Sequence, residues 1–158
     1  MMKMMLDPKT DLELVRELKA PPSKVWRCWT EPALIERWFA PRPVVTRDVS
    51  IELFAGGSFK NTMDVPDHGT MVGHGCVLAV EHERRLVWTD LMQGGFRPNA
   101  DCFGFTAMIL LEPKGTGTLY RALALHRKPE DAENHAKMGF HEGWGTAAAQ
   151  LDEVALTL

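Results

Sequence analysis

The chain has 158 residues, and its 18 lysine and arginine residues nearly balance its 21 aspartate and glutamate residues, giving a net charge of -3. This length corresponds to one ordinary domain, which can bury a sizeable core without disulfides or a structural metal. The charge balance, without any cluster of lysine and arginine, excludes a typical nucleic-acid-binding protein. The three cysteines, Cys28, Cys76 and Cys102, are odd in number and widely spaced, which excludes a disulfide framework and a Cys-x-x-Cys zinc site.

The N-terminus, M-M-K-M-M-L-D-P, contains no apolar core of a signal peptide. No segment approaches the ~18 consecutive apolar residues that would span a membrane. We therefore expect a single cytoplasmic domain over residues 1–158, with residues 1–10 frayed. We expect no membrane or nucleic-acid partner, no metal and no cofactor.

Two short helices are predicted after a first strand. Residues 11–19 form the strand, because apolar side chains recur along it. Proline is tolerated in the first turn of a helix, so a helix over residues 22–29 can begin beside Pro22. Thr30 is a suitable N-cap for a second helix over residues 31–39.

The middle of the chain is predicted to form a meander of six strands. Residues 45–53 alternate apolar and polar side chains with the two-residue period of a half-buried strand, which places Val45, Val49 and Ile51 inward. Gly56-Gly57 is a hairpin signal. The remaining strands are expected over residues 58–64, 70–81, 85–92, 101–112 and 116–126.

The last segment changes period. From Pro129 onward apolar positions recur every three or four residues, which predicts one amphipathic helix of about 28 residues. A helix this long needs a large partner surface, and the concave face of a curved antiparallel sheet is the candidate. Gly139, Gly143 and Gly145 each weaken such a helix by about 1 kcal/mol relative to alanine. Close packing, a kink and space for a ligand beside Trp144 are the explanations left open.

A resemblance to a known family begins at residues 14–41, which read L-V-R-E-L-K-A-P-P-S-K-V-W-R-C-W-T-E-P-A-L-I-E-R-W-F-A-P. This stretch resembles the opening of the family related to the activator of heat shock protein 90 ATPase. Further matches follow in the family's order, namely G-G-S-F at 56–59, R-L-V-W-T at 85–89 and E-G-W-x5-Q-L at 142–151. The similarity covers residues 12–158.

The resemblance implies an α+β helix-grip fold of the START/Bet v 1-like (SRPBCC) superfamily. A curved antiparallel sheet of six to seven strands, in the order 1-7-6-5-4-3-2, would wrap around the long C-terminal helix, with two short helices after strand 1. Relatives carry a glycine before the tryptophan of the last helix, which favours close packing as the role of Gly143. A cavity between helix and sheet would hold an apolar or amphipathic small molecule.

Aromatic residues and polar residues in phase with inward apolar neighbours are the candidates for lining this cavity. The ligand-binding candidates are Trp38, Arg47, Phe59, Asn61, His74, Trp88, Asp90, Phe103, Phe105, Tyr120, His141 and Trp144. For the tryptophans the alternative is core packing. For the polar residues the alternatives are pairing of Arg16 or Arg47 with Asp90, or a one-residue shift of register that exposes them. The direction of Tyr120 is left unassigned.

The first functional hypothesis is a protein that binds a hydrophobic or aromatic small molecule and has no catalytic residue. The alternative is a polyketide cyclase- or hydrolase-like enzyme that uses the same cavity, although no P-loop, G-x-S-x-G or H-E-x-x-H motif is present. A third and weaker hypothesis is a stress-related co-chaperone of heat shock protein 90. Known activators carry an additional N-terminal domain, for which these residues leave no room. A homodimer is left open.

Overall fold

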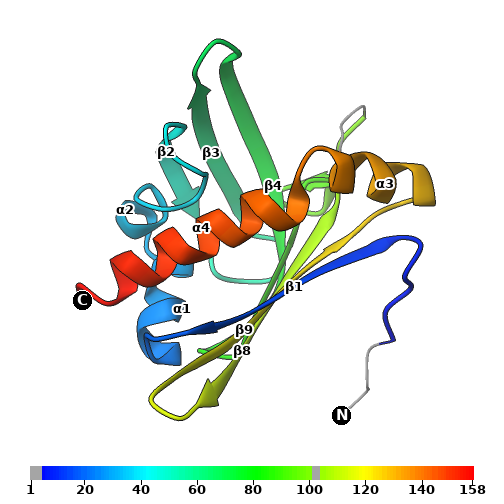
Figure 1. Ribbon diagram of the computed structural model, residues 1–158. Coiled ribbons are helices and arrows are strands. Elements are labelled where there is room, and N and C mark those ends of the chain that lie inside the picture. Colours follow the sequence, from blue (N-terminus) through cyan, green and yellow to red (C-terminus); the bar gives the residue numbers. More distant parts are fainter. Residues whose placement is uncertain (1–4, 101–103) are drawn as a thin grey trace.

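The computed structural model describes residues 5–100 and 104–158, and a large antiparallel sheet forms its body (Figure 1). The strands of this sheet are β1 (Asp11–Leu18), β2 (Val45–Ile51), β3 (Ser58–Val65), β4 (Gly69–Glu81), β5 (Arg85–Thr89), β8 (Thr106–Lys114) and β9 (Gly117–Leu125). They lie in the order β1-β9-β8-β5-β4-β3-β2. Numbered among the seven alone, this is the predicted order 1-7-6-5-4-3-2, so the helix-grip fold is confirmed.

A second, two-stranded sheet was missed by the sequence analysis. It consists of β6 (Met92–Gln93) and β7 (Arg97–Pro98), which pair within the segment that was expected to be a plain connection. Gly94 in this hairpin lies so close to Ser58 that a Cβ there would be 2.1 Å from the serine Oγ. The hairpin therefore packs against the convex face at the start of β3.

The helices lie at one end of the sheet and across its concave face (Figure 1). They are α1 (Pro22–Thr30), α2 (Pro32–Ile35), α3 (Pro129–Lys137) and α4 (Phe140–Ala155). The hydroxyl of Thr30 donates to the carbonyl of Trp26 at 2.8 Å, so this residue closes α1 and does not cap α2 as predicted. No described helix combines the length and apolar composition needed to cross a bilayer.

The single C-terminal helix predicted from residue 129 is wrong, because it is divided into α3 and α4. Gly139 has a φ of +94°, a left-handed conformation that L residues adopt only with strain, and it forms the N-cap of α4. The hydrophobic period continues across the break because both helices face the same core. Gly139 therefore interrupts the helix at a position where apolar periodicity gives no warning.

Backbone hydrogen bonds organise the segment that immediately precedes β1. Asp7 accepts backbone hydrogen bonds from Thr10 and Asp11 at 3.1 and 2.9 Å. The carbonyl of Thr10 in turn accepts from the backbone N–H of His126 at 3.0 Å. Residues 7–11 are thus a turn that is tied to the end of β9.

The core fills the space between α4 and the β1-β9-β8 part of the sheet. Tyr120 on β9 is 2% exposed, and its hydroxyl accepts a hydrogen bond from Trp29 Nε1 on α1 at 3.1 Å. Small residues on α4, including Ala147 and Ala148, allow the helix to approach large side chains such as Leu14 on β1. In this half of the fold, core side chains of β1, β8, β9 and α4 pack against one another across the concave face.

The two glycines at the start of α4 provide a test of this division. Gly139→Ala should destabilise the protein by about 1–2 kcal/mol, because alanine at a positive φ is strained. Gly143→Ala should stabilise it by about 0.5–1 kcal/mol, because the added methyl meets no neighbouring atom within 4 Å and alanine favours a helix. Urea unfolding of the two variants measures both changes. Equal signs would contradict the observed helix break.

Candidate functional site

The register of the sheet brings a row of inward residues together across β3, β4, β5 and β8. Phe59 pairs with Gly75, and Cys76 pairs with Thr89, so the inward residue after Thr89 is Asp90. The backbone N–H of Asp90 donates to the carbonyl of Phe105 at 3.1 Å. Since residues paired across a ladder share a face, the row reads Phe59, Gly75, Asp90, Phe105.

Two glycines on β4 make room for polar side chains on this face. A Cβ at Gly73 would lie 3.2 Å from both amide atoms of Asn61. A Cβ at Gly75 would lie 3.3 Å from Asp90 Oδ1 and 2.8 Å from the carbonyl oxygen of Thr89. The sequence analysis expected His74 on the concave face, which would have turned Gly73 and Gly75 to the convex face, so it did not predict this room for polar side chains.

Two polar atoms on this face are buried without a partner. Trp88 is 5% exposed, its indole packs against Phe59 with ring centroids 5.2 Å apart, and its Nε1 has no hydrogen-bond acceptor. Asn61 Oδ1 is also buried and has no donor. A buried polar group without a partner costs roughly 1–3 kcal/mol. Both atoms belong to the concave face, so a guest molecule bound there could satisfy them.

Helix α4 faces this region with little side-chain bulk. Gly143 lies two turns before Gln150 on the face that turns towards β2, and a Cβ there would meet no neighbouring atom within 4 Å. Close packing, favoured for Gly143 in the sequence analysis, is therefore corrected to open space. Gly145 has the opposite environment, since a Cβ there would lie 3.0 Å from Arg16 Nη2.

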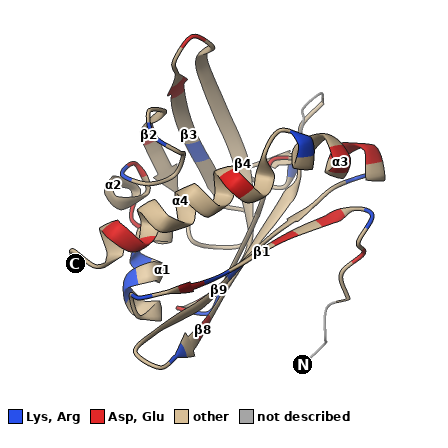
Figure 2. Cartoon of the chain, in the orientation of Figure 1, with Lys and Arg blue, Asp and Glu red and all other residues tan. Residues whose placement is uncertain are grey.

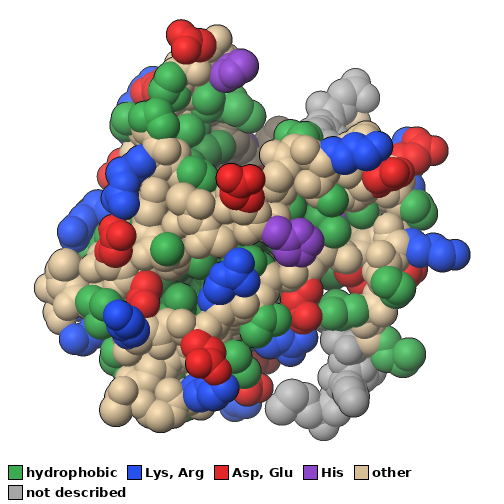
Figure 3. All heavy atoms as spheres, in the orientation of Figure 1, with side chains coloured by type: hydrophobic (Ala, Val, Ile, Leu, Met, Phe, Trp, Pro, Cys, Tyr) green, Lys and Arg blue, Asp and Glu red, His purple; other side chains and the backbone are tan. Residues whose placement is uncertain are grey.

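Trp144 is half-buried at the edge of the same region, where it packs against Phe105 and Phe140 with ring centroids 5.7 and 4.8 Å apart. The molecule is hollowed between the β3–β4 hairpin and the turn that joins α3 to α4 (Figure 3). We define the hollow as the concave region bounded on the sheet by Phe59, Asn61, Trp88, Asp90 and Phe105 and on α4 by Gly143 and Trp144.

Asp90, which directly follows β5, directs a titratable side chain to this face. Burial raises the pKa of its carboxyl from 3.8 to about 6. The carboxyl is therefore mostly ionised at neutral pH, at a cost in desolvation, and protonated in mildly acidic solution. No three His, Cys, Asp or Glu side chains among residues 5–100 and 104–158 lie close enough to hold a metal ion.

A pair of buried histidines next to Phe105 was missed by the sequence analysis. His126 Nδ1 lies 2.9 Å from the carbonyl oxygen of Thr10, and His126 Nε2 lies 2.8 Å from His135 Nδ1. The carbonyl can only accept, so His126 donates to it from Nδ1. Burial, together with the charge of His126, lowers the pKa of His135 to about 4, so His135 is neutral at physiological pH.

Two of the predicted residues lie in the core instead of the hollow. Trp38 is 3% exposed and donates from Nε1 to the carbonyl of Cys28 at 2.8 Å. Tyr120 is held by Trp29 as described above, and burial raises the pKa of its hydroxyl. Both therefore follow the core-packing alternative.

Two further residues point away from the concave face. Asp48 has a φ of +53°, and the register of β2 shifts after Arg47. Side chains in the first half of β2 that were predicted to point inward, including Val45, therefore point to the convex side. Arg47 therefore lies on the convex side, where it forms ion pairs with Asp48 and Asp64. His74 pairs in register with Lys60 and also lies on the convex side, 3.5 Å from Ser58 Oγ.

His141 is exposed at the side of α4 and contacts the carbonyl of Glu13 on β1 through Nε2 at 3.1 Å. Phe103 lies outside the described residues. The structure thus brings Phe59, Asn61, Trp88, Asp90, Phe105 and Trp144 together and separates the other described candidates from them.

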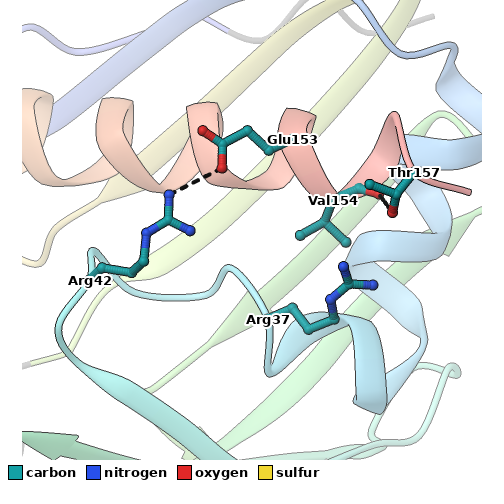
Figure 4. Close-up of a pocket in the computed structure, with 5 residues that line it drawn as sticks. All are labelled: Arg37, Arg42, Glu153, Val154 and Thr157. Atoms are coloured by element: carbon teal, nitrogen blue, oxygen red, sulfur yellow. Dashed lines mark hydrogen bonds and ion pairs between the residues drawn. The ribbon is translucent and has the colours of Figure 1, made fainter.

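Two surface pockets lie elsewhere. One, of about 360 Å³, is lined by residues of the α2–β2 segment and the end of α4, where Arg42 forms an ion pair with Glu153 at 3.1 Å (Figure 4). The other, of about 340 Å³, lies between the N-terminal segment and α3. Neither includes a residue predicted from the sequence to bind a ligand.

Comparisons with known proteins agree with this architecture. The family model described as activator of Hsp90 ATPase homolog 1-like protein matches residues 19–155. A crystal structure of a protein from Nitrosomonas europaea is 41% identical over 96% of this chain and 97% of that chain, with a TM-score of 0.93. A protein from Rhodobacter sphaeroides, 23% identical over 99% of both chains with a TM-score of 0.83, shares the fold. No protein with a curated description matches the chain.

The raised pKa of Asp90 predicts a pH-dependent stability. Below the ordinary pKa of 3.8 the carboxyl is protonated in both the folded and the unfolded chain. As pH rises through about 6 the unfolded chain ionises first, so the folded state loses up to about 3 kcal/mol of stability across this interval. Asp90→Asn should therefore be more stable than the wild type above pH 6 and similar to it at low pH, as measured by urea unfolding.

Asp64 on the convex face is the matched control. Its hydrogen bonds from Arg47 and Thr70 hold the pKa of its carboxyl below the usual value. Asp64→Asn should thus lose stability at neutral pH, and the difference from the wild type should shrink as pH falls. A difference between Asp90→Asn and the wild type that does not change with pH would show that Asp90 is not desolvated.

Proposed function

The chain belongs to the activator of Hsp90 ATPase homolog 1-like family, and on that premise we propose that it binds a small, largely apolar molecule in the hollow. The fold family is generally ligand-binding. The observation that carries the proposal is the pair of buried polar atoms without partners, Trp88 Nε1 and Asn61 Oδ1, on one face of the sheet. A folded core rarely leaves such atoms unsatisfied unless another molecule meets them.

The chemistry of the walls favours a flat, aromatic or otherwise apolar ligand. Phe59 and Phe105 are buried against Trp88, and Phe105 also packs against the half-buried ring of Trp144. Pairs of aromatic rings prefer edge or offset contacts, which a flat ligand beside Trp144 can also make. The few polar atoms would orient the molecule, as in most small-molecule sites.

An enzyme is the second candidate, and the carboxyl of Asp90 is the observation that favours it. A carboxyl with a pKa of about 6 can accept or donate a proton near neutral pH. The described strands direct no serine, cysteine or histidine to the concave face beside it, so a covalent mechanism finds no nucleophile there. In this alternative, the carboxyl of Asp90 would act as a general acid or base on a bound aromatic substrate.

Filling the open space on α4 tests the binding function. N-phenylnaphthylamine is an uncharged probe whose fluorescence rises in an apolar site, and it should bind the wild-type protein saturably. Gly143→Leu should weaken this binding at least about tenfold, because the new side chain enters the hollow where a Cβ meets no neighbour. Thermal unfolding should show that the variant remains folded.

Ala149→Leu is the matched control. This residue is exposed on the same helix, so leucine there adds the same bulk without entering the hollow. It should bind the probe as the wild type does. Equal binding by Gly143→Leu and the wild type would place the ligand elsewhere and refute the proposed site.

A further inference from the structure

We infer that the hollow selects an uncharged ligand whose polar group can both donate and accept a hydrogen bond, such as a phenol, and that it rejects carboxylates. This inference rests on the proposed binding function and adds the chemical class of the ligand. It follows from the charges that face the hollow and from the two polar atoms within it.

No lysine or arginine of the described strands β2–β5 reaches the concave face. Arg47 and Lys60 lie on the convex side, the first held by Asp48 and Asp64. Arg16 does lie on the concave face of β1, but its guanidinium is over Gly145, on the side of α4 that turns away from Gly143. An anion in the hollow would therefore meet no cation from these described strands. Lys137, at the end of α3 beside the turn that borders the hollow, is paired with Glu133 at 3.5 Å.

The charges that do approach the hollow are negative. Asp90 contributes a carboxyl between Gly75 and Phe105, and the first turn of α4 carries Glu142 next to Gly143, while α4 carries no lysine or arginine (Figure 2). Within the histidine pair beside Phe105, the lowered pKa of His135 keeps that ring neutral. Placing a carboxylate beside Asp90 would join two like charges in a poorly solvated region, which is strongly unfavourable.

The two unsatisfied atoms define the polar group that fits. Trp88 Nε1 can only donate, and Asn61 Oδ1 can only accept. A hydroxyl group carries both an acceptor lone pair and a donor hydrogen. It can therefore accept a hydrogen bond from Trp88 Nε1 or donate one to Asn61 Oδ1. A purely apolar ligand would leave both atoms buried and unpaired, and a carboxylate offers no hydrogen to Asn61.

Three probes of nearly equal shape separate these effects, namely naphthol, methylnaphthalene and naphthoate. Isothermal titration of the wild-type protein at pH 7.5 should give a dissociation constant for naphthol roughly tenfold lower than for methylnaphthalene, the effect of one satisfied hydrogen bond. Naphthoate should bind at least about tenfold more weakly than naphthol, because of repulsion and desolvation.

Variants assign each preference to its residue. Trp88→Phe keeps the ring and removes the N–H, so it should reduce the preference for naphthol over methylnaphthalene. Asp90→Asn should strengthen naphthoate binding several-fold and so reduce the preference for naphthol over naphthoate. Lys60→Ala, on the convex side beside Phe59 and Asn61, should leave all three affinities unchanged.

The outcomes distinguish the inference from the function on which it rests. If naphthoate or methylnaphthalene binds as tightly as naphthol, the inferred ligand class is wrong while the binding function stands. If neither these probes nor N-phenylnaphthylamine binds, the proposed function fails and the inference fails with it. Naphthol selectivity that survives in both Trp88→Phe and Asp90→Asn would also overturn the inference, since its source would lie outside the hollow.

Discussion

The position of α4 depends on the buried amide of Gln150. Its Nε2 donates to the carbonyls of Trp38 and Ala40 at 3.1 and 2.8 Å, and its Oε1 accepts from the backbone N–H of Arg42 at 2.9 Å. On the other side of the helix, Asp152 accepts from the backbone N–H groups that follow β1. Because a buried amide without partners would be costly, these bonds fix both the rotation and the register of the helix.

This anchoring explains why one helix is tightly packed at one end and open at the other. The hydrogen bonds of Gln150 and Asp152 hold the C-terminal half of α4 over α1 and β1, where Ala147 and Ala148 allow close contact. The N-terminal half has no comparable polar bond to β3 or β4 among the described residues. With the helix direction fixed by its far end, the space at Gly143 is left open, since a Cβ there would meet no neighbouring atom within 4 Å.

The order of the strands and the packing of α4 on the sheet could be predicted, since both follow from periodicity and from family motifs spread along the chain. The faces of the strands could be predicted only where the ladder is regular, as for Phe59, Asn61 and Trp88. A single irregularity at Asp48 reverses the first half of β2 and moves Arg47 to the convex side. Which glycine is left-handed, and which histidines meet across the fold, depend on tertiary contacts that no local pattern encodes.

Buried polar atoms without a hydrogen-bond partner also occur outside the concave face, at Arg85 Nε and Asp131 Oδ2, but three features that lower stability lie together on it. The desolvated carboxyl of Asp90, the unpartnered indole N–H of Trp88 and the unpartnered amide oxygen of Asn61 all lie on neighbouring strands of one face. Elsewhere buried polar side chains such as Gln150, Thr118 and Tyr120 have partners. If packing alone governed this region, apolar side chains of similar size would serve it better. Local departures of this kind are expected where a protein meets another molecule, which is why they mark the hollow as a site and not as a defect of the core.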